Sequence, residues 1–102
     1  MMTEQKRMSL IGVFDSGIGG LTVARELISQ FPKTDLVYLG DTARLPYGAK
    51  SPETVTRYAV RCVQFLIDAG VEQVVVACNT ASAHAIPTLR TTFKGIPILG
   101  VV

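Results

Sequence analysis

The stretch SLIGVFDSGIGG, residues 9–20, joins an apolar run to a polar, glycine-rich turn. Residues 9–14 are apolar at successive positions, which is typical of a strand that is covered on both faces of a sheet. Three further runs share this character, at residues 35–39, 73–77 and 96–102. We therefore expect four buried strands.

Segments with helical spacing separate these four runs. Residues 20–31 place four apolar side chains on one face, and residues 51–69 place four more; these side chains are Ala24, Leu27, Ile28, Phe31, Val55, Ala59, Cys62 and Leu66. Ser51-Pro52-Glu53 is a good helix start and Gly70 a natural stop. A third helix is expected from residue 79 to about 93, with Pro87 kinking or splitting it.

The alternation of strands and helices predicts an α/β fold with right-handed crossovers. We expect an open parallel sheet with helices on both faces, a flavodoxin-like three-layer sandwich. The 102 residues suffice for one core. Residues 1–8 are expected to form a flexible tail and residues 9–102 a single domain.

Composition excludes several classes of protein. The chain is 48% hydrophobic and 18% charged, which is too apolar for a disordered protein, yet it has no run long enough to span a membrane. The N-terminus has no signal-peptide pattern. The net charge of +2 comes from scattered residues, so nothing points to nucleic acid. Two cysteines are too few for a disulfide scaffold, which favours a reduced, cytoplasmic setting.

Polar or glycine-rich segments follow the first three strands, at residues 15–20, 40–48 and 78–82. In an open parallel sheet, ligands bind outside the carboxyl ends of the strands. The first segment is either an anion cradle with Asp15 taking part or a tight turn capped by Asp15 or Ser16. It lacks the dinucleotide fingerprint, because Thr22 stands where a glycine is needed, and it is not a Walker loop.

Cys78 ends the third strand and precedes a predicted helix, whose dipole favours a thiolate. It is therefore a candidate nucleophile or general base, or else a small core residue. Cys62 lies on an apolar helical stripe and is assigned to the core. His84 is expected to be a surface or packing residue, on a different helix face from Cys78.

The segment after the second strand contains Pro46-Tyr47-Gly48, in which Tyr47 has a hydroxyl to offer to a ligand. Arg44 is suited either to a ligand carboxylate or to Asp41 in its own loop. No residues have metal-ligand spacing, and no lysine follows a strand where pyridoxal phosphate would be held, so we expect neither metal nor cofactor.

Together, the motifs Asp15-Ser-Gly-Ile-Gly-Gly20, Asp41-Thr-Ala-Arg-Leu-Pro-Tyr-Gly48 and Cys78-Asn-Thr-Ala-Ser82 resemble the N-terminal half of the glutamate racemases, in the aspartate/glutamate racemase family. The resemblance covers about residues 10–102. It implies cofactor-independent interconversion of L- and D-glutamate by two cysteines, which supplies D-glutamate for peptidoglycan. Glutamate is then the partner, with no nucleic acid or membrane, and a homodimer stays open.

The resemblance also implies roles for individual residues. Cys78 matches the first catalytic cysteine and Asp15 the acid that assists it. The substrate contacts implied are Asp15, Ser16, Pro46, Tyr47, Gly48, Asn79 and Thr80.

The family has a second α/β domain with the other cysteine in a Cys-Thr-His motif, which these 102 residues lack. We therefore expect a chain truncated before that domain and inactive by itself. Two alternatives remain: a hydrolase or transferase with Cys78 as nucleophile, and a non-catalytic module that binds a dicarboxylate. In the second, two copies would each supply a Cys78 to a shared cleft.

Overall fold

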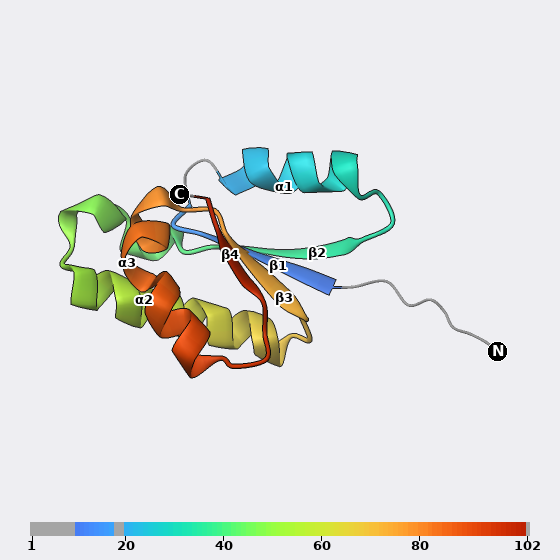
Figure 1. The fold of residues 1–102 in the computed structure, drawn as a ribbon. Coiled ribbons are helices and arrows are strands. Elements are labelled where there is room, and N and C mark those ends of the chain that lie inside the picture. The colour runs from blue at the N-terminus through green and yellow to red at the C-terminus, as the bar shows by residue number, and fades with distance from the viewer. Residues whose placement is uncertain (1–9, 18–19, 102) are drawn as a thin grey trace.

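Four strands and three α-helices alternate along the chain, as the sequence predicts (Figure 1). The structure, a computed structural model, describes residues 10–17 and 20–101. The elements are β1 (Leu10–Asp15), α1 (Gly20–Gln30), β2 (Asp35–Gly40), α2 (Pro52–Asp68), β3 (Gln73–Val76), α3 (Asn79–Thr92) and β4 (Ile98–Gly100). Two 3-10 turns, η1 (Thr42–Arg44) and η2 (Tyr47–Ala49), lie between β2 and α2. The predicted tail at residues 1–8 lies outside the described residues.

The strands form one parallel sheet in the order β2-β1-β3-β4. Phe14 of β1 pairs with Leu39 of β2 on one side and with Val76 of β3 on the other. The chain turns outward from β1 to β2 and then crosses back to β3, so the topological switch point lies between β1 and β3. In open α/β sheets this point is where ligands bind.

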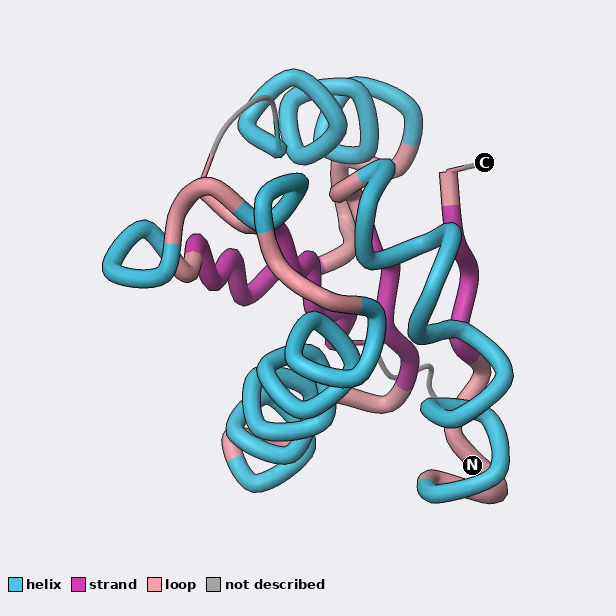
Figure 2. The backbone as a smooth tube through the Cα atoms, turned by 90° about the vertical axis from the view of Figure 1, so that its left-hand side faces the viewer, coloured by secondary structure: helices cyan, strands magenta, loops and turns pink. Residues whose placement is uncertain are grey.

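Helices cover both faces of the sheet, which confirms the predicted three-layer arrangement. α1 lies on one side, and α2 and α3 lie on the other (Figure 1). A view turned by 90° shows the strands between α1 and α2 (Figure 2). The larger core fills the space between the sheet and the α2–α3 pair; its fully buried members include Phe14, Val63, Leu66, Val76 and Leu89.

The boundaries of α2 follow directly from local chemistry. The Ser51 hydroxyl accepts a hydrogen bond from the Thr54 N–H at 3.1 Å, which caps the helix, and Pro52 occupies its first turn. At the other end Gly70 has a φ of +101°, a conformation that glycine adopts without strain. The predicted start and stop are confirmed.

Pro87 is predicted to kink or split α3, and the structure shows that the helix is not split. Proline removes one helical hydrogen bond, to the carbonyl four residues earlier. Both Pro87 and Ala83 are exposed, so water can take the place of the lost donor. The last strand is also shorter than residues 96–102.

The apolar stripe predicted for residues 20–31 is only partly buried. Ala24 is buried, whereas Ile28 and Phe31 are more than half exposed. Leu99 of β4 is 62% exposed as well. Within residues 10–17 and 20–101, α1 is the one helix on its side of the sheet and it lies over β1 and β2, so these side chains have little to pack against.

Leu66→Ala tests the contact between α2 and the sheet. Leu66 is fully buried, and its Cδ1 atom lies so close to β1 that a Cβ on Gly12 would meet it at 3.1 Å. Loss of this side chain leaves a cavity, so we expect the free energy of unfolding in urea to fall by about 2–5 kcal/mol. Phe65→Ala is the matched control, because the Phe65 side chain, next to Leu66 in the sequence, is 60% exposed. An equal loss of stability in both variants would contradict the role of Leu66 in the core.

Candidate active site

The carboxyl ends of three strands are fastened together by backbone hydrogen bonds. The Asp41 N–H donates to the Asp15 carbonyl at 2.9 Å, and the Ala77 N–H donates to the Phe14 carbonyl at 2.8 Å. Cys78 follows Ala77 directly. Asp15, Asp41 and Cys78 therefore leave the sheet at one edge, as expected for loops that build a common site.

The turn after β1 passes very close to the loop after β2. Gly17 has a φ of +117°, and a Cβ at this position would lie 2.5 Å from the Thr42 Cγ2 atom. Only glycine fits such an approach, so this residue brings the two loops into contact. The rest of the expected anion cradle includes residues 18–19, which lie outside the described residues.

Asp15 is fully buried, and Ser16 beside it is also buried. The Tyr38 hydroxyl of β2 donates to Asp15 Oδ2 at 3.5 Å. Burial, together with the Asp15 carboxylate, raises the pKa of Tyr38. Tyr38 is not among the site residues predicted from the sequence. Its signal is the strand register: Val13 pairs with Tyr38, so the tyrosine lies on the same face of the sheet as Asp15.

Cys78 is the N-cap of α3. Its Sγ atom accepts a hydrogen bond from the Ala81 N–H at 3.5 Å, and its side chain is buried. Asn79, which is exposed, and Thr80, which is half-buried, form the start of the helix. The unpaired N–H groups and the dipole of a helix N-terminus favour an anion, so the first turn of α3 can hold a carboxylate beside the thiol.

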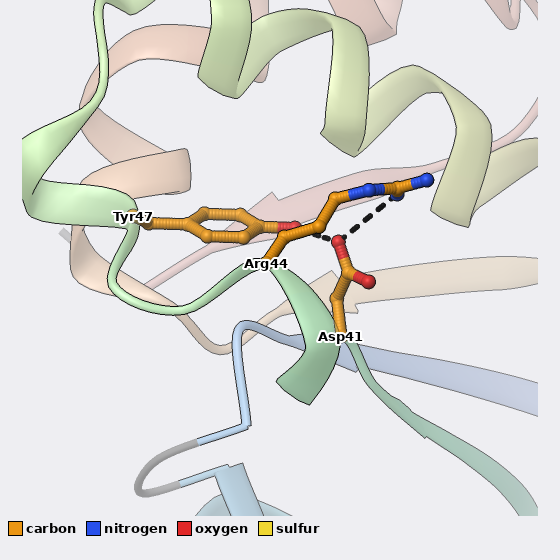
Figure 3. Close-up of polar contacts among 3 residues, drawn as sticks. All are labelled: Asp41, Arg44 and Tyr47. Carbon is orange, nitrogen blue, oxygen red and sulfur yellow. Dashed lines mark hydrogen bonds and ion pairs between the residues drawn. The ribbon is translucent and has the colours of Figure 1, made fainter.

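The loop after β2 contributes an exposed Pro46 and Gly48 and a buried Tyr47. The Tyr47 hydroxyl was expected to be offered to a ligand, but it donates to Asp41 Oδ2 at 2.5 Å (Figure 3). Burial and this hydrogen bond raise the pKa of Tyr47. Its hydroxyl is thus used inside the loop, and the exposed backbone around Gly48 is the part that a ligand can reach.

Arg44 pairs with Asp41, with Nη1 and Oδ2 3.2 Å apart, so the structure selects the internal one of its two predicted partners. Cys62 is buried in the core as predicted, and burial, reinforced by Asp41, raises the pKa of its thiol to about 12. His84 lies exposed on α3. Of the two cysteines, Cys78 is therefore the one at the strand ends.

Comparison with known proteins relates this chain to one group of enzymes. No family profile matches the chain. Over 92 residues it is 55% identical to the glutamate racemase of Persephonella marina, covering 90% of this chain and 35% of that protein. The solved glutamate racemase of Aquifex pyrophilus superposes with a TM-score of 0.87 at 52% identity, over 91% of this chain and 36% of that one.

The glutamate racemase of Francisella tularensis, solved in complex with D-glutamate, has a TM-score of 0.86 and 47% identity, over 91% of this chain and 35% of that one. The chain thus spans about a third of the length of its relatives. The fold and the sequence agree over the same nine-tenths of the chain. Over that stretch, the chain is homologous to part of the glutamate racemases.

Proposed function

We propose that this chain supplies one half of the catalytic site of a cofactor-independent glutamate racemase. The observation that carries the proposal is the position of Cys78, which caps α3 at the sheet edge where Asp15 ends β1. The similarity to glutamate racemases supports the choice of substrate. The D-glutamate produced would serve peptidoglycan synthesis. Residues 9–102 would then be the N-terminal domain of a two-domain enzyme.

The proposed reaction begins with the Cys78 thiolate, which removes the α-proton of glutamate and becomes a thiol. The electron pair of the broken C–H bond is delocalised into the α-carboxylate. A second thiol, outside these 102 residues, delivers a proton to the opposite face of the α-carbon. Excluding water from the site makes the thiolate more reactive as a base, and fixed hydrogen-bond donors stabilise the negative charge that develops on the substrate. The buried thiol and the start of α3 meet that need.

Asp15 is proposed to assist Cys78 in proton transfer from the neighbouring strand end. The substrate contacts proposed are Asp15, Ser16, Pro46, Tyr47, Gly48, Asn79 and Thr80. Asn79 and Thr80 would hold the amino and carboxylate groups, since they begin α3 beside Cys78. For Tyr47 we propose a contact through its backbone, because its hydroxyl donates to Asp41.

A thiol hydrolase or transferase is less well supported. Such an enzyme needs a histidine that accepts the thiol proton. His84, the single histidine of the sequence, is exposed six residues beyond Cys78, and the Cys78 Sγ atom accepts its hydrogen bond from the Ala81 N–H. The binding-module alternative differs from the racemase in lacking proton exchange at the α-carbon.

The setting of the protein is proposed on two further observations. Within the described residues, no helix combines the length and the apolarity that a membrane crossing requires. Cys62 and Cys78 are both free thiols, which fits a reduced compartment. We infer a cytoplasmic location, and a small-molecule substrate by analogy with the relative solved in complex with D-glutamate.

A chimera tests the role of Cys78. In the glutamate racemase of Aquifex pyrophilus, the matching segment is replaced by this chain. We expect the chimera to interconvert L- and D-glutamate, and Cys78→Ser to lower kcat by roughly 10²–10⁴-fold, the usual contribution of a general base. Cys62→Ala is the control and should retain activity. A Cys78→Ser chimera as active as its parent would refute the assignment.

The isolated chain tests the need for a second thiol. We expect the purified 102-residue chain to leave the optical rotation of L-glutamate unchanged, because one base serves only one face of the α-carbon. A homodimer, in which two copies each provide Cys78, is the competing arrangement. Turnover that rises with the square of protein concentration, together with a dimer mass by light scattering, would favour the homodimer over our expectation.

Alkylation tests the raised pKa of the Cys62 thiol. Only the thiolate reacts with iodoacetamide. Because the pKa of Cys62 is raised to about 12, its thiolate fraction in the folded chain near pH 8 is on the order of 10³-fold below that in urea. We expect Cys62 labelling, followed by peptide mass spectrometry, to stay slow in the folded chain until the pH approaches 12. Asp41→Asn should accelerate it, since a nearby negative charge is lost. Equal rates in folded and unfolded chains at pH 8 would contradict the shift.

A further inference from the structure

The loop between β2 and α2 is closed by a set of side-chain contacts centred on Asp41. Its Oδ2 atom accepts hydrogen bonds from Arg44 Nη1 at 3.2 Å and from the Tyr47 hydroxyl at 2.5 Å (Figure 3). Arg44 ends the turn η1 and Tyr47 begins η2. One carboxylate oxygen therefore ties the two turns together.

Aromatic rings attach this loop to the rest of the molecule. The Arg44 guanidinium lies over the Tyr58 ring of α2, 4.6 Å from its centroid. The Tyr47 ring lies 5.7 Å from that of Tyr58 and 6.2 Å from that of Phe14, the residue before Asp15. We call Asp41, Arg44, Tyr47 and Tyr58 the Asp41 clamp.

The turn η2, which the clamp holds, lies beside the start of α3. Gly48, next to Tyr47, faces Thr80, because a Cβ added to it would lie 4.0 Å from the Thr80 Oγ1 atom. Thr80 is the second residue of α3, two positions after Cys78. The position of η2 thus decides how close the exposed Gly48 backbone comes to the turn that Cys78 caps.

We propose that Arg44 is a positioning residue, which holds the Tyr47–Gly48 turn beside Thr80 by pairing with Asp41 and stacking on Tyr58 at the same time. A planar guanidinium can do both, whereas a lysine ammonium offers the charge without the flat stacking surface. Arg44 also balances the negative charge of Asp41 close to a site that is to receive a carboxylate. The inference takes the ligand, glutamate, from the proposed function, but the geometry of the turn is independent of it.

A partly exposed ion pair contributes little to overall stability, so the effect of Arg44 should appear in the position of the loop rather than in unfolding. The side chains of Arg44 and Asp41 are 33% and 13% exposed. A displaced loop with unchanged stability therefore distinguishes a positioning role from a merely structural one.

The test uses the ¹⁵N-labelled 102-residue chain. In Arg44→Gln we expect the amide resonances of Gly48 and Thr80 to shift or broaden, the dissociation constant for L-glutamate to rise several-fold, and the urea midpoint to stay unchanged. Arg44→Lys, which keeps the charge, should restore part of the affinity. Tyr58→Leu removes the ring beneath the guanidinium and should displace the same two amides. Arg57→Gln is the control, an exposed arginine of α2 that should alter neither amide.

Gly48 and Thr80 amides that coincide with those of the parent chain in both Arg44→Gln and Tyr58→Leu would overturn the inference. Unaltered glutamate affinity in these variants would overturn it as well. A parent chain that binds no glutamate, with variants that still displace both amides, would leave the positioning role supported, because one half of a two-domain site need not bind the substrate by itself.

Discussion

The parallel pairing of β1 with a strand on each side is the constraint on which the site depends. Its last two carbonyls accept from Asp41 and from Ala77, so the ends of β2 and β3 cannot move independently of β1. Side chains alternate along a strand, and Phe14 therefore packs into the core while Asp15 points to the other face. A slip of one residue would exchange these two environments, so the same register that builds the core also places the acid.

Under the proposed function, Cys78 has two roles that favour different residues. As a helix cap, a serine, threonine, asparagine or aspartate would serve better, because their oxygens are stronger acceptors than sulfur. The Ser51 cap of α2 accepts through oxygen at 3.1 Å, and the Cys78 cap of α3 accepts through the larger sulfur atom at 3.5 Å. A sequence selected for helix stability alone would repeat the better cap. The weaker one fits a position where a thiol is needed for proton transfer.

Features that depend on local chemistry were predictable from the sequence, such as the ends of α2 at Ser51 and Gly70 and the burial of Cys62. The convergence of the three loops was predictable too, since it follows from the parallel sheet. Two features of the site were not. The partner of the Tyr47 hydroxyl depends on how the loop folds back on Asp41, and the contact of Tyr38 with Asp15 depends on a register that only pairing defines. Periodicity likewise places Ile28 and Phe31 on an apolar stripe, without showing what the stripe meets.

Under the proposed function, the two acids at the strand ends have different roles, one structural and one chemical. Asp41 is committed to the loop, because one of its oxygens accepts from both Arg44 and Tyr47 and so neutralises a cation and orders two turns. Asp15 lies on the central strand, beside the strand that leads into Cys78. Under the proposed function, the proton chemistry falls to Asp15 and Cys78, and Asp41 acts only by fixing the wall opposite the start of α3.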